Sequence, residues 1–452
     1  MFKKAAALGL AMAMLSAPMS MLADNDDAPR GIPHLDHAFV ILMENHGYQQ
    51  VIDNPNEPFL NSLIANKKVN LATNYFAVGH PSLTNYLEIV GGSNFGVRSD
   101  NPPDWHNQNC LPNIATGIVN ADDGASPAPP PVPFESGNVC PIAGTGTDAR
   151  TEAVDNWNEV TLPTFPYLAN IDGVKSVPAG ATKGKTIADQ LVHAGKSWKS
   201  YQENLPITGA DKVNYSNGTA SNLTDFSTSS PLAPLTSGSV VQAYAVKHNP
   251  FAYFKNVQEG TEFGNSLKNI VGFDGPRGLY ADLATGNVPS LAFISPNQCN
   301  DQHGRGNGDA FCAFDPGSGT AGLTFGTQVG LNPGLILQGD NTIERIVEAI
   351  RHSPAWHDGR AAIVIVWDEN DYSGISTPPN GLFPPQNQNK VVLTVETNVD
   401  ADDLGVQSNR YYNSFSLLKT LEAGFGLPCL NHACDDGVKV MRDLFASDRD
   451  GR

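Results

Sequence analysis

Residues 37–48 read "HAFVILMENHGY". The apolar run from Ala38 to Met43 is typical of a β-strand that is buried in a protein interior. It ends abruptly in Glu44, Asn45 and His46, which are costly to bury without partners. A buried strand with polar side chains at its end predicts a functional site at one edge of a sheet.

Two other stretches repeat this pattern. Residues 290–303 read "SLAFISPNQCNDQH" and residues 361–371 read "AAIVIVWDEND". Segments with the apolar spacing of helices lie at residues 58–67, 84–92, 186–195 and 341–353, and a further strand is expected at Trp198–Tyr201. Near-continuous apolar strands that alternate with helices predict an α/β fold with a mostly parallel central sheet that is covered on both faces. Functional groups gather beyond the carboxyl ends of such strands, so we expect the three polar clusters to share one site.

The composition narrows the range of partners. The chain has 452 residues, 40% of them hydrophobic, and a formal net charge of −18. A strongly acidic surface disfavours binding to nucleic acids and to anionic membranes. A small anionic substrate is still compatible with it, because a bound metal ion can reverse the local field. The oligomeric state is not predicted.

We expect a signal peptide at residues 1–23 and a single domain over residues 24–452. The first segment has Lys3 and Lys4, then an apolar stretch, then small residues near Ala23. A membrane anchor is the alternative, but this stretch is short for a span and contains Pro18. The mature chain should therefore be exported, either to the periplasm or to the medium. Surface insertions are expected near residues 99–150, which are rich in Pro, Asn and Gly, and near residues 206–240, which are rich in Ser, Thr and Gly.

The six cysteines suit an exported protein. Pairing of sequence neighbours would give three disulfides: Cys110–Cys140, Cys299–Cys312 and Cys429–Cys434. Neighbour pairing is one of 15 connectivities, and zinc thiolates are a second alternative, although no CxxC spacing is present.

Four residues at strand ends are candidate metal ligands: Glu44, Asn45, Asp368 and Glu369. Carboxylate and amide oxygens suit hard divalent ions such as Mg²⁺, Ca²⁺ or Mn²⁺, and added imidazoles would favour zinc or iron. The alternative is that they are ordinary cap and turn residues.

A second group of residues suits nucleophilic catalysis. Ser82 follows Pro81 and precedes an apolar helix, where free N–H groups favour an anion. It is either a nucleophile or an N-cap residue. His248 and His303, the latter two residues after Asp301, could hold phosphate oxygens or protonate a leaving group.

Seven motifs in order resemble the phosphoesterase family that includes secreted acid phosphatases and non-haemolytic phospholipases C. They begin with "VILMENHGYQQVIDNPNEPFLNSL" and "NYFAVGHPSLTNYLEIVGG". They continue with "TIADQLVHAGKSWKSYQENLP", "KHNPFAYF", "FISPNQCNDQHG", "IVIVWDEND" and "FSLLKTLEAGFGLP". The resemblance runs from about His37 to about Asp435. It favours the acid-phosphatase branch, because the chain lacks long C-terminal extensions.

The resemblance implies an alkaline-phosphatase-like fold, which is a three-layer α/β/α sandwich. It also implies a secreted, metal-dependent phosphomonoesterase that acts through a phosphoserine. It implies that Glu44, Asn45, Asp368 and Glu369 hold one or more divalent ions (Mg, Ca, Mn, Fe or Zn). Catalysis would fall to four residues: Ser82 as nucleophile, His248 and His303 around the phosphoryl group, and Asp301 in support. The expected partner is a small phosphate ester.

Two positions depart from the family pattern. Ser414 stands where the family commonly has His, which could alter activity or substrate range, and Thr84 stands where Pro is common. The leading alternative function is a phospholipase C-type phosphodiesterase, which for a choline headgroup needs aromatic side chains. The aromatic candidates are Tyr48, Trp105, Trp367 and Tyr372. A non-catalytic binding protein and a sulfatase are weaker alternatives.

Overall fold

The computed structural model describes residues 28–79, 81–95, 97, 99–107, 138–143, 185–219, 240–304, 333–370, 389–399 and 404–445. The expected signal peptide and most of the two expected insertions lie outside these residues. Part of the second insertion is described: strand β4 (Tyr215–Thr219) pairs with β5 (Val240–Ala245) in a separate two-stranded sheet.

Within the described residues, nine strands form the central sheet, in the order β10-β2-β9-β8-β1-β7-β3-β6 with β11 beside β2. The three strands expected from the apolar runs are β1 (His37–Met43), β7 (Leu291–Ser295) and β8 (Ala361–Trp367). They lie side by side and parallel, with Val40 opposite both Phe293 and Val364. All of these strands are buried apart from the half-buried His37, because helices cover both faces.

The other strands extend the sheet on both sides of this centre. They are β2 (Asn70–Phe76), β3 (Trp198–Gln202), β6 (Ile270–Val271), β9 (Lys390–Thr397), β10 (Gln407–Ser408) and β11 (Tyr412–Asn413). Strand β9 runs antiparallel to both β8 and β2, and the other pairs of this sheet are parallel. The predicted mostly parallel sheet is confirmed, with one antiparallel strand inside it.

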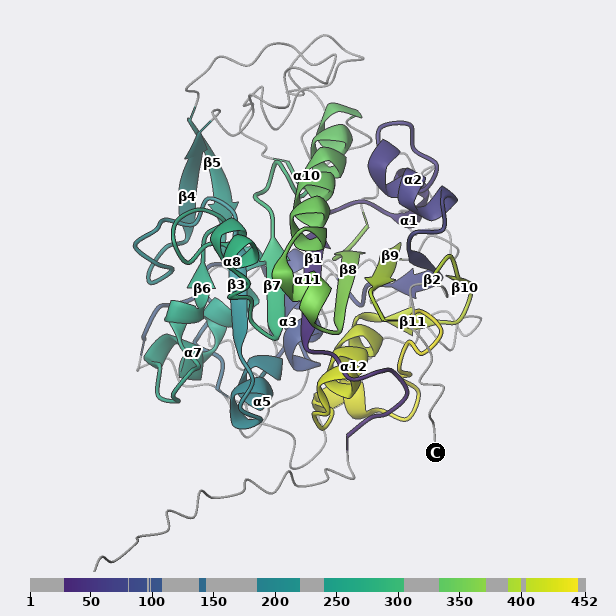
Figure 1. Ribbon diagram of the computed structural model, residues 1–452. Helices are drawn as coiled ribbons and strands as arrows, with labels where there is room; N and C mark the ends of the chain where they lie inside the picture. Colours follow the sequence, from purple (N-terminus) through teal and green to yellow (C-terminus); the bar gives the residue numbers. More distant parts are fainter. Residues whose placement is uncertain are drawn as a thin grey trace, which may run out of the picture.

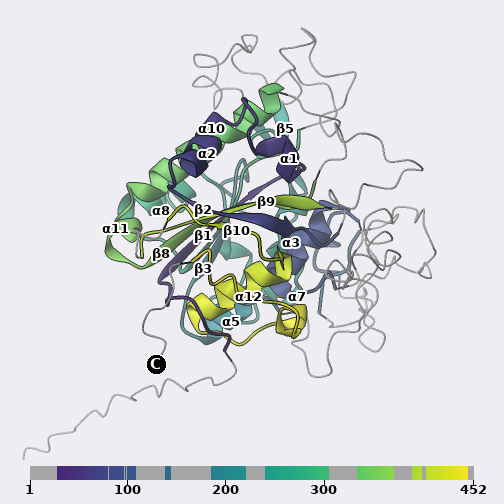
Figure 2. The ribbon, with the colours of Figure 1, turned by 90° about the vertical axis from the view of Figure 1, so that its right-hand side faces the viewer.

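Two layers of helices enclose the sheet (Figures 1 and 2). One layer contains α2 (Pro58–Ala65), α8 (Leu279–Thr285), α10 (Pro333–Arg351) and α11 (Pro354–Asp358). The other contains α3 (Ser82–Gly91), α5 (Ile187–His193), α7 (Lys255–Glu259) and α12 (Ser414–Phe425). Short helices complete the described part: α1 (Tyr48–Val51), η3 (Val246–His248), η4 (Pro250–Tyr253), η5 (Leu267–Asn269) and η9 (Asn431–Cys434). This is the predicted three-layer α/β/α sandwich.

The expected helices all form, with different starts for two of them. Helix α3 begins at Ser82 instead of Thr84, and α10 begins at Pro333, eight residues before the periodic segment. None of the helices in the described ranges is both long and apolar enough to cross a membrane.

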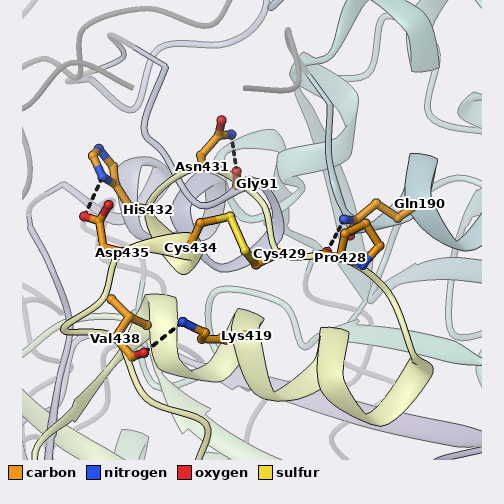
Figure 3. The surroundings of a disulfide bond; sticks show 10 residues. All are labelled: Gly91, Gln190, Lys419, Pro428, Cys429, Asn431, His432, Cys434, Asp435 and Val438. Carbon is orange, nitrogen blue, oxygen red and sulfur yellow. Dashed lines mark hydrogen bonds and ion pairs between the residues drawn. A yellow bond between two sulfur atoms is a disulfide. The ribbon is translucent and has the colours of Figure 1, made fainter. Parts of the chain in front are cut away.

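The predicted disulfide Cys429–Cys434 is present and holds the loop that follows α12 (Figure 3). Inside this loop Asn431 Nδ2 donates to the carbonyl oxygen of Gly91 at 2.6 Å. The backbone N–H of His432 donates to the carbonyl oxygen of Gly92 at 2.9 Å. The loop therefore covers the C-terminal end of α3. Cys140 and Cys299 are also disulfide-bonded, whereas Cys110 and Cys312 lie outside the described residues.

Candidate active site

The strand pairing brings the three polar clusters to one edge of the sheet. Met43 lies opposite Trp367 in the β1–β8 pair, so Glu44 and Asp368 leave the sheet next to each other. The backbone N–H of Asp368 donates to the carbonyl oxygen of Met43 at 3.0 Å. The backbone N–H of Glu44 donates to the carbonyl oxygen of Asp301 at 2.8 Å. The segments after β1, β7 and β8 are thus joined directly, as expected for parallel neighbours.

Ser82 is the first residue of α3 and its side chain faces these clusters. Its hydroxyl oxygen lies 3.1 Å from Glu44 Oε2 and 3.1 Å from Glu369 Oε1. The residue before the helix is Pro81, and Ser82 itself is buried. The side chain therefore bonds across the site instead of capping its own helix.

Asp368 and Glu369 are held in place by backbone and amide donors. Asp368 Oδ1 accepts hydrogen bonds from the backbone N–H groups of Glu369, at 2.7 Å, and Asn45, at 3.2 Å. Asn45 adopts a positive φ of 50°, a turn conformation that asparagine tolerates. Asn45 thus meets the cluster through its main chain. Glu369 Oε2 accepts from Asn85 Nδ2 at 3.2 Å.

His248 is fully buried between two carboxylates. Its Nε2 lies 3.1 Å from Glu44 Oε1 and its Nδ1 lies 3.1 Å from Asp301 Oδ2. The ring stacks on Tyr86 with centroids 5.4 Å apart. Burial, together with Lys247 and His303, lowers the pKa of His248 well below its usual value, so the neutral imidazole predominates. A neutral imidazole has one N–H, so one of its two nitrogens points a lone pair at a carboxylate.

His303 is oriented by its own loop. Its backbone N–H donates to Asp301 Oδ1 at 2.7 Å, and its Nδ1 lies 2.7 Å from the carbonyl oxygen of Gly304. A carbonyl accepts only, so Nδ1 carries the proton and the Nε2 lone pair faces the site.

Lys247 and Asp100 are site residues that the sequence analysis missed. Lys247 Nζ lies 2.8 Å from His303 Nε2, 2.9 Å from Asp100 Oδ2 and 3.4 Å from Ser82 Oγ. Burial lowers the pKa of Lys247, but the carboxylates of Asp100 and Glu44 outweigh burial and raise it above its usual value. Lys247 precedes His248 directly, which was the one sequence signal for it. Asp100 lies within the expected insertion at 99–150, which carried no such signal.

The buried carboxylates fit a bound cation. Burial and the neighbouring Glu369 raise the pKa of Glu44 to about 8, and burial and Glu44 raise those of Asp301 and Asp368 well above their usual values. Asp368 Oδ2 is buried without a hydrogen-bond donor among the residues that the structure describes. Buried carboxylates that repel one another remain ionised when a metal ion offsets their charge.

Among the described residues, one group of three donors has the spacing of a metal site, and it contains Glu44. Candidate ligand atoms of Glu44, His248 and His303 lie within 4.8 Å of one another. The carboxylates of Asp368 and Glu369 lie beside that of Glu44, and those of Glu44 and Glu369 both contact the Ser82 hydroxyl. The structure therefore brings all the predicted catalytic residues and the three predicted carboxylate ligands together, and adds imidazoles to the candidate donors.

The two positions that depart from the family pattern lie in ordinary packing environments. Ser414 is buried at the start of α12, beside the Tyr75 hydroxyl. Thr84 donates from its hydroxyl to the carbonyl oxygen of Pro81 at 2.7 Å.

A parallel sheet that presents a buried serine, carboxylates and histidines beyond its strand ends defines an α/β protein with a site of hydrolase type. Residues 49–312, more than half of the chain, match the model of the phosphoesterase family. The chain belongs to this family.

Its curated relatives are distant, and each match covers only part of the relative. The chain is 23% identical over 406 residues to an acid phosphatase of Aspergillus fumigatus, a match that covers 89% of this chain and 57% of that protein. It is 26% identical over 303 residues to a probable acid phosphatase of Kluyveromyces lactis (65% and 55% covered). A phosphatidylinositol-3-phosphatase of Mycobacterium tuberculosis is 28% identical over 160 residues, a match that covers 35% of this chain and 52% of that protein. The chain spans little more than half the length of these relatives.

A solved structure of an alkaline phosphatase superfamily protein from Vibrio parahaemolyticus overlaps 88% of this chain and 69% of its own, with a TM-score of 0.41 and 14% identity. A TM-score of this size carries no argument about function.

Proposed function

We propose that this chain is an exported, metal-dependent phosphoric ester hydrolase of the phosphomonoesterase type, with Ser82 as its nucleophile. The observation that carries the proposal is the setting of the Ser82 hydroxyl. It lies 3.1 Å from two carboxylates and 3.4 Å from the ammonium group of Lys247, at the start of a helix. A hydroxyl so placed can lose its proton to a neighbouring carboxylate while positive charge stabilises the alkoxide.

The reaction would proceed in two displacements. Ser82 Oγ attacks phosphorus, the bond to the ester oxygen breaks, and a phosphoserine forms. Water then attacks the same phosphorus, which releases phosphate and restores the hydroxyl. A divalent cation held by Glu44, Asp368 and Glu369, or by Glu44 with the two histidines, would supply charge that neutralises the phosphoryl oxygens.

The side chains around Ser82 divide the remaining roles. Lys247 binds a phosphoryl oxygen on the side of His303 and stabilises charge that develops there. His303 is better placed than His248 to pass a proton to the leaving oxygen, because its Nε2 faces the site and can take that proton from Lys247 Nζ, 2.8 Å away. His248 lies between two carboxylates and against Tyr86. Asp301 orients both histidines through its two oxygens.

The aromatic residues argue for a monoester over a choline diester. The indole N–H of Trp367 donates to Gln302 in the core, and that of Trp105 donates to Asn214. Lys390 already lies over the ring of Tyr48, 4.2 Å from its centroid. These three are engaged elsewhere, and Tyr372 lies outside the described residues. Two of the relatives named above are also acid phosphatases by name.

The test compares p-nitrophenyl phosphate with p-nitrophenyl phosphorylcholine, with and without chelator, from acid to alkaline pH. Chelator-sensitive hydrolysis of the monoester is expected. Preference for the diester would support the phospholipase alternative, and inertness toward both would refute the proposed activity.

A further inference from the structure

Gln302 lies between Asp301 and His303, yet its side chain points away from them into the core. The residue is fully buried and has a φ of 80°, a backbone conformation that is unusual for glutamine. This turn sends Asp301 and His303 toward the site and the Gln302 side chain toward β8 and α10. Unusual backbone that persists must be held by its surroundings.

One end of the Gln302 amide binds the neighbouring strand end. Its Oε1 accepts the indole N–H of Trp367 at 2.9 Å. Trp367 is the last residue of β8, directly before Asp368. Gln302 therefore links the loop of Asp301 and His303 to the strand that carries Asp368 and Glu369.

The other end of the amide binds the helix layer. Its Nε2 donates to Glu57 Oε2 at 2.9 Å and Oε1 at 3.1 Å, and to the carbonyl oxygen of Ile336 at 3.0 Å. Helix α10 leaves room for this side chain, because a Cβ on Gly339 would lie 2.2 Å from Gln302 Cγ. Glu57 precedes α2, whose first N–H groups donate to Asp340 of α10.

We propose that Gln302 is a positioning residue that holds Asp301 and His303 in register with Asp368 and Glu369. This inference rests on the proposed function of the site. The Gln302 amide bonds the Trp367 N–H, the Glu57 carboxyl and the Ile336 carbonyl, and all four residues are fully buried. Its loss would leave three buried polar groups short of a partner and free the loop to shift. The catalytic groups need their geometry within a fraction of an ångström, so a small shift is costly.

The test uses Gln302→Met, which keeps the length of the side chain and removes its hydrogen bonds. The matched control is Gln258→Met: Gln258 is also buried, accepts the backbone N–H of His106 at 2.8 Å and donates to Ala252 O at 2.7 Å, on the distant helix α7. Three quantities are measured: kcat and KM for p-nitrophenyl phosphate, the Kd for Mn²⁺ by calorimetry, and the melting temperature.

In Gln302→Met we expect kcat to fall about 10- to 100-fold, while KM stays within about threefold of the wild-type value. The Kd for Mn²⁺ should rise about tenfold, as when a residue that supports a metal ligand from outside the coordination sphere is replaced. Gln258→Met should lower the melting temperature while kcat and the Kd for Mn²⁺ stay unchanged. Equal loss of melting temperature in both variants, with wild-type kcat and Mn²⁺ affinity in Gln302→Met, would reduce Gln302 to a stability role.

Trp367→Phe keeps an aromatic ring and removes only the N–H donor, and so tests the link if Gln302→Met does not fold. A fall in kcat of about threefold or more and weaker Mn²⁺ binding are expected. Wild-type values of both would overturn the proposal. The Mn²⁺ measurement separates the proposed function from the proposed role of Gln302. If the wild type does not hydrolyse phosphate esters but Gln302→Met still weakens its Mn²⁺ binding, the proposed function is refuted and the positioning role is retained.

Discussion

The ammonium nitrogen of Lys247 lies 3.4 Å from the hydroxyl oxygen of Ser82 and 2.9 Å from Asp100 Oδ2. Asp100 Oδ1 in turn accepts the backbone N–H of Leu83 at 3.0 Å. A single carboxylate thus holds both the lysine and the first turn of α3. This arrangement fixes a positive charge beside the proposed nucleophile.

Replacing Lys247 with Met should therefore lower kcat for p-nitrophenyl phosphate about 100-fold or more, because preorganised charge at a transition state contributes this much. Lys199→Met is the matched control, since Lys199 is equally buried and pairs with Asp282 far from the site. It should cost stability only. Equal kcat in Lys247→Met and wild type would remove Lys247 from the mechanism.

Ser82→Ala should abolish turnover, with a loss of kcat of about a thousandfold or more, because it removes the hydroxyl oxygen that would take up the phosphoryl group. The fold should survive, since the change removes one hydroxyl from the start of a helix. Ser416→Ala in α12 removes another buried hydroxyl, one that lies 3.3 Å from Asn413 Oδ1, and should keep activity. Near-normal kcat in Ser82→Ala would disprove the nucleophile assignment.

Asp368→Asn should weaken Mn²⁺ binding about tenfold or more, because a charged ligand becomes neutral. The amide oxygen can still accept the two backbone N–H groups that Asp368 Oδ1 accepts, so the local structure should hold. Calorimetry measures the affinity, with Asp282→Asn as the control: this aspartate is also buried and bonds Lys199 and Tyr201. An unchanged Mn²⁺ affinity would exclude Asp368 from the ligand set.

Removing the Cys429–Cys434 disulfide should destabilise the loop that covers the end of α3. The bridge closes a short loop with a sequence separation of 5, for which chain entropy predicts about 2 kcal/mol. The double variant Cys429→Ser/Cys434→Ser should melt a few degrees lower, and unlike a reductant it leaves the disulfides of Cys140 and Cys299 intact. The same melting temperature as wild type would show that the hydrogen bonds to Gly91 and Gly92 suffice.

Buried carboxyls outside the site should make stability fall as pH rises. Burial raises the pKa of Glu422 in α12 well above its ordinary value of 4.5 and that of Asp340 to about 6. The folded state therefore binds these protons more tightly than the unfolded state. These two groups therefore stabilise the folded state fully when the pH lies below their ordinary pKa values. This stabilisation is lost as the pH rises through the pKa values of the folded state.

Glu422→Gln tests this effect, because it removes one such group while keeping its shape. From about pH 5 to about pH 8 its melting temperature should fall less than that of wild type, and it should exceed the wild-type value at the upper end. Glu259→Gln, at an exposed position on α7, should leave the curve unchanged. Parallel curves for wild type and Glu422→Gln would show that Glu422 does not titrate with unfolding.

The centre of the sheet and most residues of the candidate site could be predicted from local sequence patterns and family motifs. Apolar runs such as Ala38–Met43 have few alternatives to a buried strand, and parallel strands must bring their carboxyl ends to one edge. Glu44, Asp301 and Asp368 therefore met as expected. The family motifs added the roles proposed for Ser82, His248 and His303.

The surroundings of these groups depend on contacts between segments that are distant in the sequence. Strand β9 lies antiparallel between β8 and β2, and strand order depends on contacts between distant segments, which local pattern does not encode. Lys247 and Asp100 meet across 147 positions of sequence, and Gln302 bonds Trp367 across 65. A lysine or a glutamine is usually solvated on a surface. Folding buries Lys247 and Gln302 and supplies their partners, and the roles proposed for both residues depend on these contacts.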